Sequence, residues 1–240
     1  MLKRRVLLGL CLVILGSGCE QSSRAGKPKT KSRHQLVARE TSYKDKTPEE
    51  WLKYLRSNDV RRRNRAADAL VQYGPDQIPA ILAVLDDKSL DGPRLSAAQA
   101  LGAYGEKAEV AVPSLVAALK ETKWNGRDGA AMALGKIRQR LDVTIPALIG
   151  ALQNDPDETV RAAAAEALGK IRNDGSPVVA ALAKALEDKT INVRAEAAEA
   201  LQKIGPKAHA ALPALQKAAE SSAFVVSQAA TEAIKAIKGR

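Results

Sequence analysis

Residues 160–171 read Val-Arg-Ala-Ala-Ala-Ala-Glu-Ala-Leu-Gly-Lys-Ile, and the middle of this stretch returns along the chain at a nearly fixed interval. An Ala-x-x-Ala-Leu window, or a one-step variant of it, closes six times at spacings of 31, 33, 34, 33 and 33 residues. The closing residues are Leu70, Leu101, Leu134, Leu168, Leu201 and Ile234. A fixed period in this range is the signature of stacked structural repeats.

Further columns repeat in the same register. Seven residues before the closing position stand Arg63, Arg94, Arg127, Arg161, Arg194 and, in the sixth unit, Ser227. An upstream apolar ladder consists of Trp51, Ile81, Leu115, Leu148, Leu182 and Leu215. Apolar residues recur at intervals of three and four, which predicts amphipathic helices, and no sustained period of two suggests strands. Each unit is therefore expected to hold two helices.

Helix boundaries are also marked. The expected starts of first helices are at Pro79, Pro113, Pro146 and Pro213, since proline is tolerated in a first turn. Asp59 and Asp157 precede a column Arg by four residues and can cap second helices. The expected stops after second helices are at Gly74, Gly105 and Gly205.

The Ala columns have a packing reason, because small side chains allow helix axes to approach closely. One helical hairpin cannot bury its apolar face alone, so neighbouring units must stack. The sequence predicts an all-α fold, an α-solenoid of six helical hairpins. The expected units cover about 48–74, 75–105, 106–138, 139–172, 173–205 and 206–240.

These residues resemble a known family. The Pro-x-Leu first helices, the pairs Val160-Arg161 and Val193-Arg194, and the string from Ala164 to Ile171 look like HEAT repeats. The short, Ala-rich form is similar to the HEAT-like units of phycobilisome lyases. The resemblance implies a right-handed superhelix whose second helices line a concave, partner-binding surface. The last unit, with Ser227, Thr231 and Ile234, looks like a capping repeat.

The amino-terminal residues indicate export. Lys3, Arg4 and Arg5 precede an apolar run over residues 6–15, followed by small residues and Cys19. The run is far shorter than the ~20 residues that span a bilayer, so it is typical of a secretory signal peptide. It resembles a bacterial lipoprotein signal, which implies a lipid on Cys19. Residues 1–18 are then the signal peptide, and residues 19–47 the lipidated Cys and a disordered basic tether.

This arrangement predicts an exported protein, lipid-anchored on the extracytoplasmic side of a bacterial membrane. An uncleaved anchor and a plain secreted protein are the alternatives. The other cysteine, Cys11, lies in the apolar run, so the mature repeats would hold no thiol for a disulfide or a metal site.

The formal net charge of +11 is unevenly placed. Residues 1–47 hold 11 Lys or Arg against 3 Asp or Glu, and residues 48–240 hold 27 against 24. The nearly balanced repeats argue against nucleic-acid binding. One basic cluster, Arg61, Arg62 and Arg65, is a candidate contact for the membrane or an acidic partner, unless it is only a solvated helix face. The column residues Arg63, Arg94, Arg127, Arg161 and Arg194 are expected to form a structural ladder of inter-repeat hydrogen bonds.

The candidate partner-binding surface is a strip of second-helix positions pointing away from the Ala and Leu columns. Its residues are Asp68, Met132, Lys136, Glu166, Lys170, Glu199 and Lys203. Two Glu-to-Lys pairs within the strip have the favourable spacing of four residues. The competing interpretation is an ordinary solvated face.

Catalysis has little support in the sequence. His34 and His209 are the only histidines, no His-Glu pair has helical spacing, and no Gly-rich phosphate loop or nucleophile elbow occurs. We therefore expect a non-catalytic scaffold or adaptor at the cell envelope that binds a protein partner and needs no metal, cofactor or small-molecule substrate. The alternative is an enzyme or enzyme subunit of the phycobilisome-lyase type, with a cofactor held in the superhelix.

Overall fold

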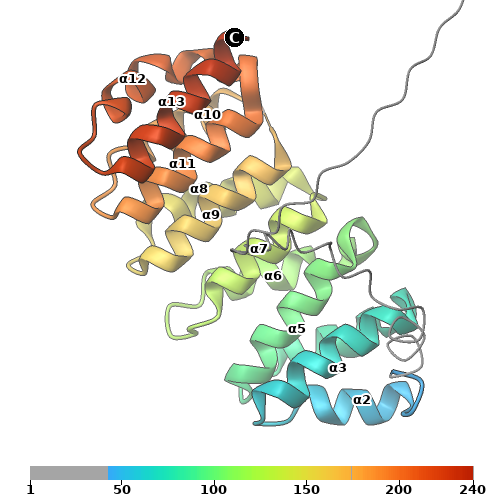
Figure 1. Cartoon of the computed structure of the whole chain (residues 1–240). Coiled ribbons are helices and arrows are strands. Elements are labelled where there is room, and N and C mark those ends of the chain that lie inside the picture. Colours follow the sequence, from blue (N-terminus) through green and yellow to red (C-terminus); the bar gives the residue numbers. More distant parts are fainter. Residues whose placement is uncertain (1–42, 174, 240) are drawn as a thin grey trace, which may run out of the picture. The chain divides into compact units, whose positions relative to one another are not determined.

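The computed structural model describes residues 43–173 and 175–239. The predicted signal peptide, the lipid-acceptor Cys19 and most of the predicted tether lie outside the described residues. Every regular element of the described part is helical, and the helices follow one another as six hairpins (Figure 1). The prediction of an all-α solenoid of six hairpins is confirmed.

The helix bounds follow the predicted register. The first helices are α2 (Pro48–Leu55), α4 (Ile78–Asp86), α6 (Val112–Leu119), α8 (Leu141–Asn154), α10 (Ser176–Ala185) and α12 (Leu212–Ala219). The second helices are α3 (Val60–Tyr73), α5 (Asp91–Ala103), α7 (Arg127–Ile137), α9 (Glu158–Ile171), α11 (Ile191–Ile204) and α13 (Phe224–Lys238). Short 3₁₀ helices η1 (Pro75–Gln77), η2 (Gly105–Ala111) and η3 (Gly205–Ala211) lead into α4, α6 and α12.

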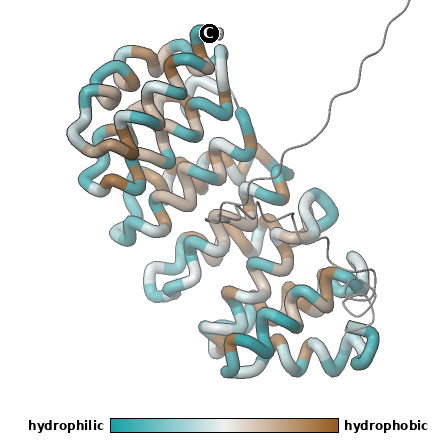
Figure 2. Tube along the Cα trace, viewed as in Figure 1, coloured by the Kyte–Doolittle hydropathy of each residue, from teal (hydrophilic) through white to brown (hydrophobic). Residues whose placement is uncertain are grey.

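Two layers run along the stack. Each second helix packs against its own first helix and against the second helices of neighbouring hairpins, whereas the first helices touch one another less. Brown and teal positions mix along each helix in Figure 2, as expected of helices with one buried face. The second helices therefore form the more tightly packed layer.

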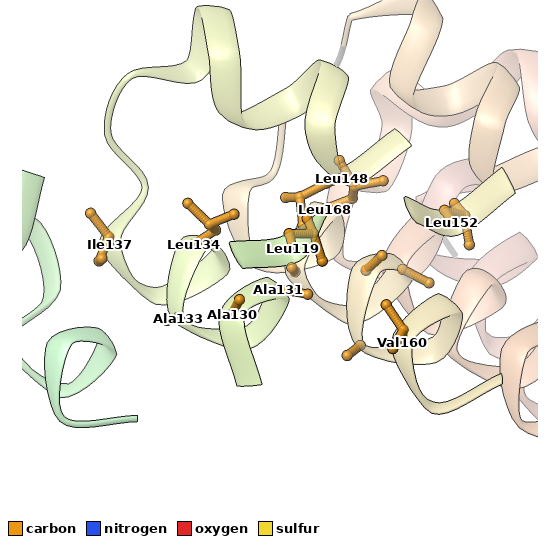
Figure 3. Packing of buried hydrophobic residues seen from close by; sticks show 14 of the residues in the cluster. Leu119, Ala130, Ala131, Ala133, Leu134, Ile137, Leu148, Leu152, Val160 and Leu168 are labelled. Atoms are coloured by element: carbon orange, nitrogen blue, oxygen red, sulfur yellow. The ribbon is translucent and has the colours of Figure 1, made fainter. Parts of the chain in front are cut away.

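The core is one continuous cluster of the repeated apolar columns. Leu134, Leu148 and Leu168 have no exposed surface, and the Ala columns are buried beside them. In Figure 3 the side chains of Leu119, Leu148 and Leu168 point into the same region between neighbouring hairpins. Burial is shared across hairpin boundaries, so no hairpin has a core of its own.

Glycines set the closest approach between second helices. Gly102, Gly135 and Gly169 each follow a closing Leu, and a Cβ added there would lie 2.9, 2.6 and 2.7 Å from an Ala Cα of the next second helix. Real Cβ atoms do not approach so closely, so these positions exclude a side chain. Val71 and Gln202 stand at the same place in the first and fifth hairpins.

The predicted caps are present at both ends of second helices. Asp59 accepts a hydrogen bond from the Arg62 backbone N–H at 3.0 Å, and Asp157 accepts one from Thr159 at 2.9 Å. Gly74 and Gly205 end α3 and α11 with positive φ. These residues stop and start the helices as their types suggest.

The prediction that Pro146 marks a helix start is wrong, because α8 begins at Leu141 and contains Pro146 in its interior. Before α4, α6 and α12 the preceding residues form separate 3₁₀ helices, and proline then starts the α-helix. Before α8 these residues are already α-helical, and Thr144 Oγ1 donates to the Gln139 carbonyl at 2.9 Å.

The first and last hairpins differ from the central ones in their hydrogen bonds and exposed residues. In the last hairpin Ser227 Oγ donates to the Ala219 carbonyl at 2.7 Å, and Thr231 is exposed where other hairpins have a buried Ala. At the first hairpin, described residues ahead of position 48 also contact the helices. There Trp51 Nε1 donates to the Tyr43 carbonyl at 2.8 Å, and Tyr73 Oη donates to the Lys46 carbonyl at 2.6 Å.

None of the described helices is long and apolar enough to cross a membrane.

Candidate protein-docking surface

Buried arginines join the central hairpins. Arg127 donates from Nε and Nη2 to both carboxylate oxygens of Asp155 at 2.8 and 3.0 Å, and Arg161 does the same to Asp188 at the same distances. Both arginine side chains are 5% exposed, and the side chains of Asp155 and Asp188 are 9% and 14% exposed. The bidentate geometry ties the start of one second helix to the loop of the next hairpin.

Arg94, the arginine of the preceding hairpin, has a different set of partners. Arg94 Nε donates to the Leu85 carbonyl at 2.8 Å, and its Nη2 donates to Glu121 of the next hairpin at 2.9 Å. The Arg94 guanidinium also lies 4.4 Å from the ring centre of the buried Trp124. Arg127 and Arg161 each bind two carboxylate oxygens, whereas Arg94 binds one carboxylate oxygen and contacts an aromatic ring.

Among the described residues, the outer members of the ladder donate no hydrogen bond to a neighbouring hairpin, contrary to the predicted role. Arg63 donates only to the Ser57 and Asn58 carbonyls of its own loop, and its buried Nε has no partner. Arg194 donates to the Asp188 carbonyl of its own loop at 2.8 Å. In the other hairpins, the acid that accepts from the arginine stands six residues before the arginine of the next hairpin. At the two outer junctions this position holds Lys88 and Ser221, which are not acids.

The predicted partner-binding strip lies on the second helices, with unequal exposure. Asp68 and Lys136 are exposed, and the remaining members are half-buried: Met132, Glu166, Lys170, Glu199 and Lys203. Lys170 lies 2.7 Å from Glu166, and Lys203 lies 3.8 Å from Glu199. The expected pairing of these charges is therefore present in the structure.

A groove of about 290 Å³ crosses α7, α9 and α11. Four carboxylate residues, Asp128, Glu158, Glu166 and Glu196, line it together with Met132. Its other lining residues are Thr159, Ala162, Ala163 and Asn192. The groove combines an acidic rim with a floor of small and apolar side chains.

The groove brings together only two predicted residues, Met132 and Glu166. Asp128, Glu158 and Glu196 were missed, although a helical-face argument could have found them. Asp128 precedes Met132 by four residues and Glu196 precedes Glu199 by three, so each stands one turn earlier on the same face. The lysines of the strip lie further toward the ends of the second helices.

The electrostatics of the groove are acidic. Burial raises the pKa of Glu196 above its ordinary value, and the neighbouring carboxylates of Glu199 and Glu166 raise it further. Lys203 and Lys170 oppose the rise only in part. A positively charged ligand group placed here would relieve the repulsion among these carboxylates.

A second groove, of about 550 Å³, lies between α6 and α8 in the other helix layer. Val116, Leu119, Val143 and Pro146 are among its lining residues, and Gly150 leaves room along α8. The buried ion pair of Arg127 and Asp155 contributes to its lining. This groove is predominantly apolar.

The predicted basic cluster is exposed at the first hairpin. The Arg62 guanidinium lies 5.9 Å from the Tyr54 ring centre, and that of Arg65 lies 5.3 Å from the Trp51 ring centre. Arg65 also approaches Asp45 at 3.7 Å. Arg61, by contrast, has no carboxylate within ion-pair distance in the described part of the chain.

A family model for HEAT repeats matches residues 48–135, 94–169 and 145–235. The chain belongs to the HEAT-repeat family. This match confirms the HEAT-repeat resemblance that the sequence indicated. No match was found among curated proteins.

Several solved structures have a similar fold. An engineered protein superposes with a TM-score of 0.60 at 24% identity, covering 80% of this chain and 96% of that chain. A designed armadillo repeat protein in complex with the peptide (KR)4 gives 0.56 at 22%, covering 79% and 98%. The complex of CpcE and CpcF of phycocyanin lyase from Nostoc sp. PCC7120 gives 0.52 at 23%, covering 67% and 99%. At these identities the similarity concerns the fold.

Among the described residues, neither of the two grooves is lined by a histidine. His209 is exposed on η3, and His34 lies outside the described residues. Within residues 43–173 and 175–239, no cluster of three or more His, Cys, Asp or Glu could hold a metal ion.

Proposed function

We propose that this HEAT-repeat protein is a non-catalytic scaffold or adaptor that docks a protein partner along its second helices. The observation that carries the proposal is the acidic groove across α7, α9 and α11. Its carboxylates come from three successive hairpins, so an extended segment can cross several repeats. The partner segment that fits best carries Lys or Arg beside a small or apolar residue.

The surroundings of the groove support this choice of partner. Met132, Ala162 and Ala163 offer apolar contact, whereas Glu158 and Glu196 offer acceptors for cationic side chains. A designed armadillo repeat protein of similar fold has been solved in complex with (KR)4, a peptide of this charge. The same class of ligand is our proposed class for this chain.

The proposal places the scaffold at the bacterial cell envelope, anchored by a lipid on Cys19 on the extracytoplasmic side. Its support is the order of charged, apolar and small residues over positions 3–19. Metabolic labelling with a radioactive fatty acid would test it, with Cys19→Ala as the unlabelled control.

A second candidate is an enzyme subunit of the phycobilisome-lyase type, favoured by the structural similarity to the CpcE and CpcF complex. This candidate predicts that the protein binds a bilin, so that the protein separated from free bilin shows a visible absorption band. The scaffold proposal predicts no such band.

The docking test uses the full-length protein and a fluorescent (KR)4 peptide as probe, read by anisotropy. Reversal of Asp128, Glu158 and Glu196 to Lys should weaken binding at least about 10-fold, since charge-assisted contacts are lost and repulsion appears. The matched control reverses three exposed acids outside the groove, Glu106, Glu109 and Glu220. Equal binding by both triple variants would refute the groove as the docking site.

A further inference from the structure

We propose that the first hairpin docks end-on against an anionic phospholipid surface through the cationic face of α2 and α3. The proposal rests on the membrane attachment proposed above and adds an orientation: the solenoid stands on its first hairpin. The second-helix surface is then left accessible to the partner.

Cations and aromatic rings are concentrated at this end of the stack. Lys46 Nζ lies 5.6 Å from the Trp51 ring centre and 5.8 Å from the Tyr54 ring centre. Arg62 and Arg65 cover the same two rings from α3. Trp51 is fully buried beneath them, so the first hairpin covers its outer aromatic residues with cations.

Asp45 lies 3.3 Å from Lys46 and 3.7 Å from Arg65, and two further local acids are engaged by helix amino termini. Glu50 accepts from the Thr47 backbone N–H at 2.8 Å in a capping box, and Asp59 accepts from the Arg62 backbone N–H. Arg61 and Arg62 are exposed, and no carboxylate of the described residues lies within ion-pair distance of either. Their charges are available to an outside anion.

The charge distribution along the chain singles out this hairpin. Residues 43–74 hold 8 Lys or Arg against 5 Asp or Glu, whereas residues 75–240 hold 21 against 20. The excess positive charge of this part of the chain is therefore gathered at the first hairpin. The preceding residues 1–42 add 9 basic residues against 2 acidic ones.

A membrane fits these observations better than an acidic protein does. Basic residues next to an attached lipid strengthen binding to anionic leaflets. The basic face is continuous in sequence with the segment that carries the proposed lipid. An acidic protein partner would need no such position in the chain.

The test compares three forms of the full-length protein on vesicles. One is unchanged, one carries Lys46→Glu, Arg61→Glu and Arg62→Glu, and the matched control carries Lys217→Glu, Lys235→Glu and Lys238→Glu at the last hairpin. Vesicles contain phosphatidylcholine alone or with about one third phosphatidylglycerol. Flotation measures partitioning, and hydrogen exchange of peptides from α2 and α3 reports contact.

With phosphatidylglycerol, the unchanged protein and the control should show slowed exchange in α2 and α3. The first-hairpin variant should lose this protection, and about 0.5 M salt should remove it. Its partition coefficient should fall at least about 10-fold, since each basic residue near an anionic surface contributes about 5-fold.

Equal exchange on both vesicle types, or equal behaviour of the two triple variants, would overturn the proposal. Protection of α2 and α3 by an acidic protein, such as poly-glutamate, without protection by vesicles would point to the other class of partner. Failure to float with phosphatidylcholine alone would instead refute the lipid anchor. In that case the variant comparison on phosphatidylglycerol still decides the docking.

Discussion

Arg161 and Asp188 lie 27 residues apart and form a bidentate ion pair between two neighbouring hairpins. The same guanidinium donates from Nη1 to the carbonyls of Asp155 and Pro156 at 3.0 and 3.1 Å. The hydrogen bond to Asp188 raises the pKa of Arg161 although burial opposes it. One side chain thus holds its own loop and the next hairpin together.

Removing a paired arginine should cost far more than removing an unpaired one. Arg161→Met leaves Asp188 buried without its cation, so we expect a loss of about 3 kcal/mol in the free energy of unfolding. Arg63→Met loses the hydrogen bonds to the Ser57 and Asn58 carbonyls, but it also removes a buried Nε that has no partner and leaves no carboxylate unpaired, so it should cost only about 1 kcal/mol. Urea unfolding followed by circular dichroism measures both. Equal losses would mean that the ion pair adds nothing to stability.

The same pair should make stability depend on acidity. Burial alone would raise the pKa of Asp188, but hydrogen bonds from Arg161 and Thr190 outweigh it and lower that pKa from 3.8 to about 2. Because the folded pKa is the lower one, the contribution is complete above about pH 5 and is lost as pH falls toward 2, amounting to about 2 kcal/mol. In Asp188→Asn, the unfolding free energy should fall less steeply between pH 5 and pH 2. An unchanged slope would contradict the assignment.

Two glycines should respond to alanine with opposite sign. In Gly135→Ala the new Cβ would lie 2.6 Å from the Ala167 Cα, so we expect a loss of about 1–3 kcal/mol from overpacking. Gly150→Ala, with nothing within 4 Å of the new Cβ, should gain up to about 1 kcal/mol from helix propensity. Thermal unfolding of the two variants distinguishes them. A stabilised Gly135→Ala variant would show that the second helices can move apart freely.

Binding of a basic peptide to the groove should weaken in acid earlier than an ordinary Glu would dictate. Burial and the carboxylates of Glu199 and Glu166 raise the pKa of Glu196 above 4.5, so its charge is lost as pH falls toward that raised value. Anisotropy with (KR)4 between pH 7 and pH 4 measures the effect. Glu196→Gln should bind more weakly at pH 7 and change less with pH. An identical pH profile in both proteins would show that Glu196 does not contact the peptide.

The raised pKa of Glu196 has a second consequence, for stability. Since its folded pKa exceeds the unfolded value, the neutral form is favoured by folding, and this contribution is lost as pH rises through the folded pKa. Glu196→Gln should therefore be slightly more stable than the unchanged protein at pH 7. Urea unfolding at pH 7 and pH 4 tests this, and a less stable variant at pH 7 would contradict it.

The repeated columns were sufficient to predict the hairpins, because each unit repeats the Ala and Leu positions that stacking requires. The start of α8 was missed since a proline is compatible with an α-helix once the residues ahead of it are already helical, as Leu141 to Ile145 are. Periodicity alone does not distinguish that continuation from the 3₁₀ helices at the equivalent places.

The site was predicted less completely than the fold. Met132 and Glu166 were found because they repeat at a fixed offset from the closing Leu, but Asp128 and Glu158 occupy no shared column. Similarly, the repeated arginines were visible in the sequence. Whether each one bonds to the next hairpin depends on the residue six places before the arginine position of that hairpin. That residue is Asp155 or Asp188 at complete rungs and Lys88 or Ser221 at the missing ones.

The bidentate rung also bears on how such a chain can change through recombination. Each central unit contributes an arginine to the unit after it and an acid to the unit before it. If unequal crossing-over removed the unit between them, Arg127 would face Asp188 in place of Asp155 and still find a carboxylate. Gene rearrangements that add or delete whole units can therefore preserve the charge balance of the interior. Rearrangements that cut a unit in half would leave a buried arginine or a buried acid without its partner.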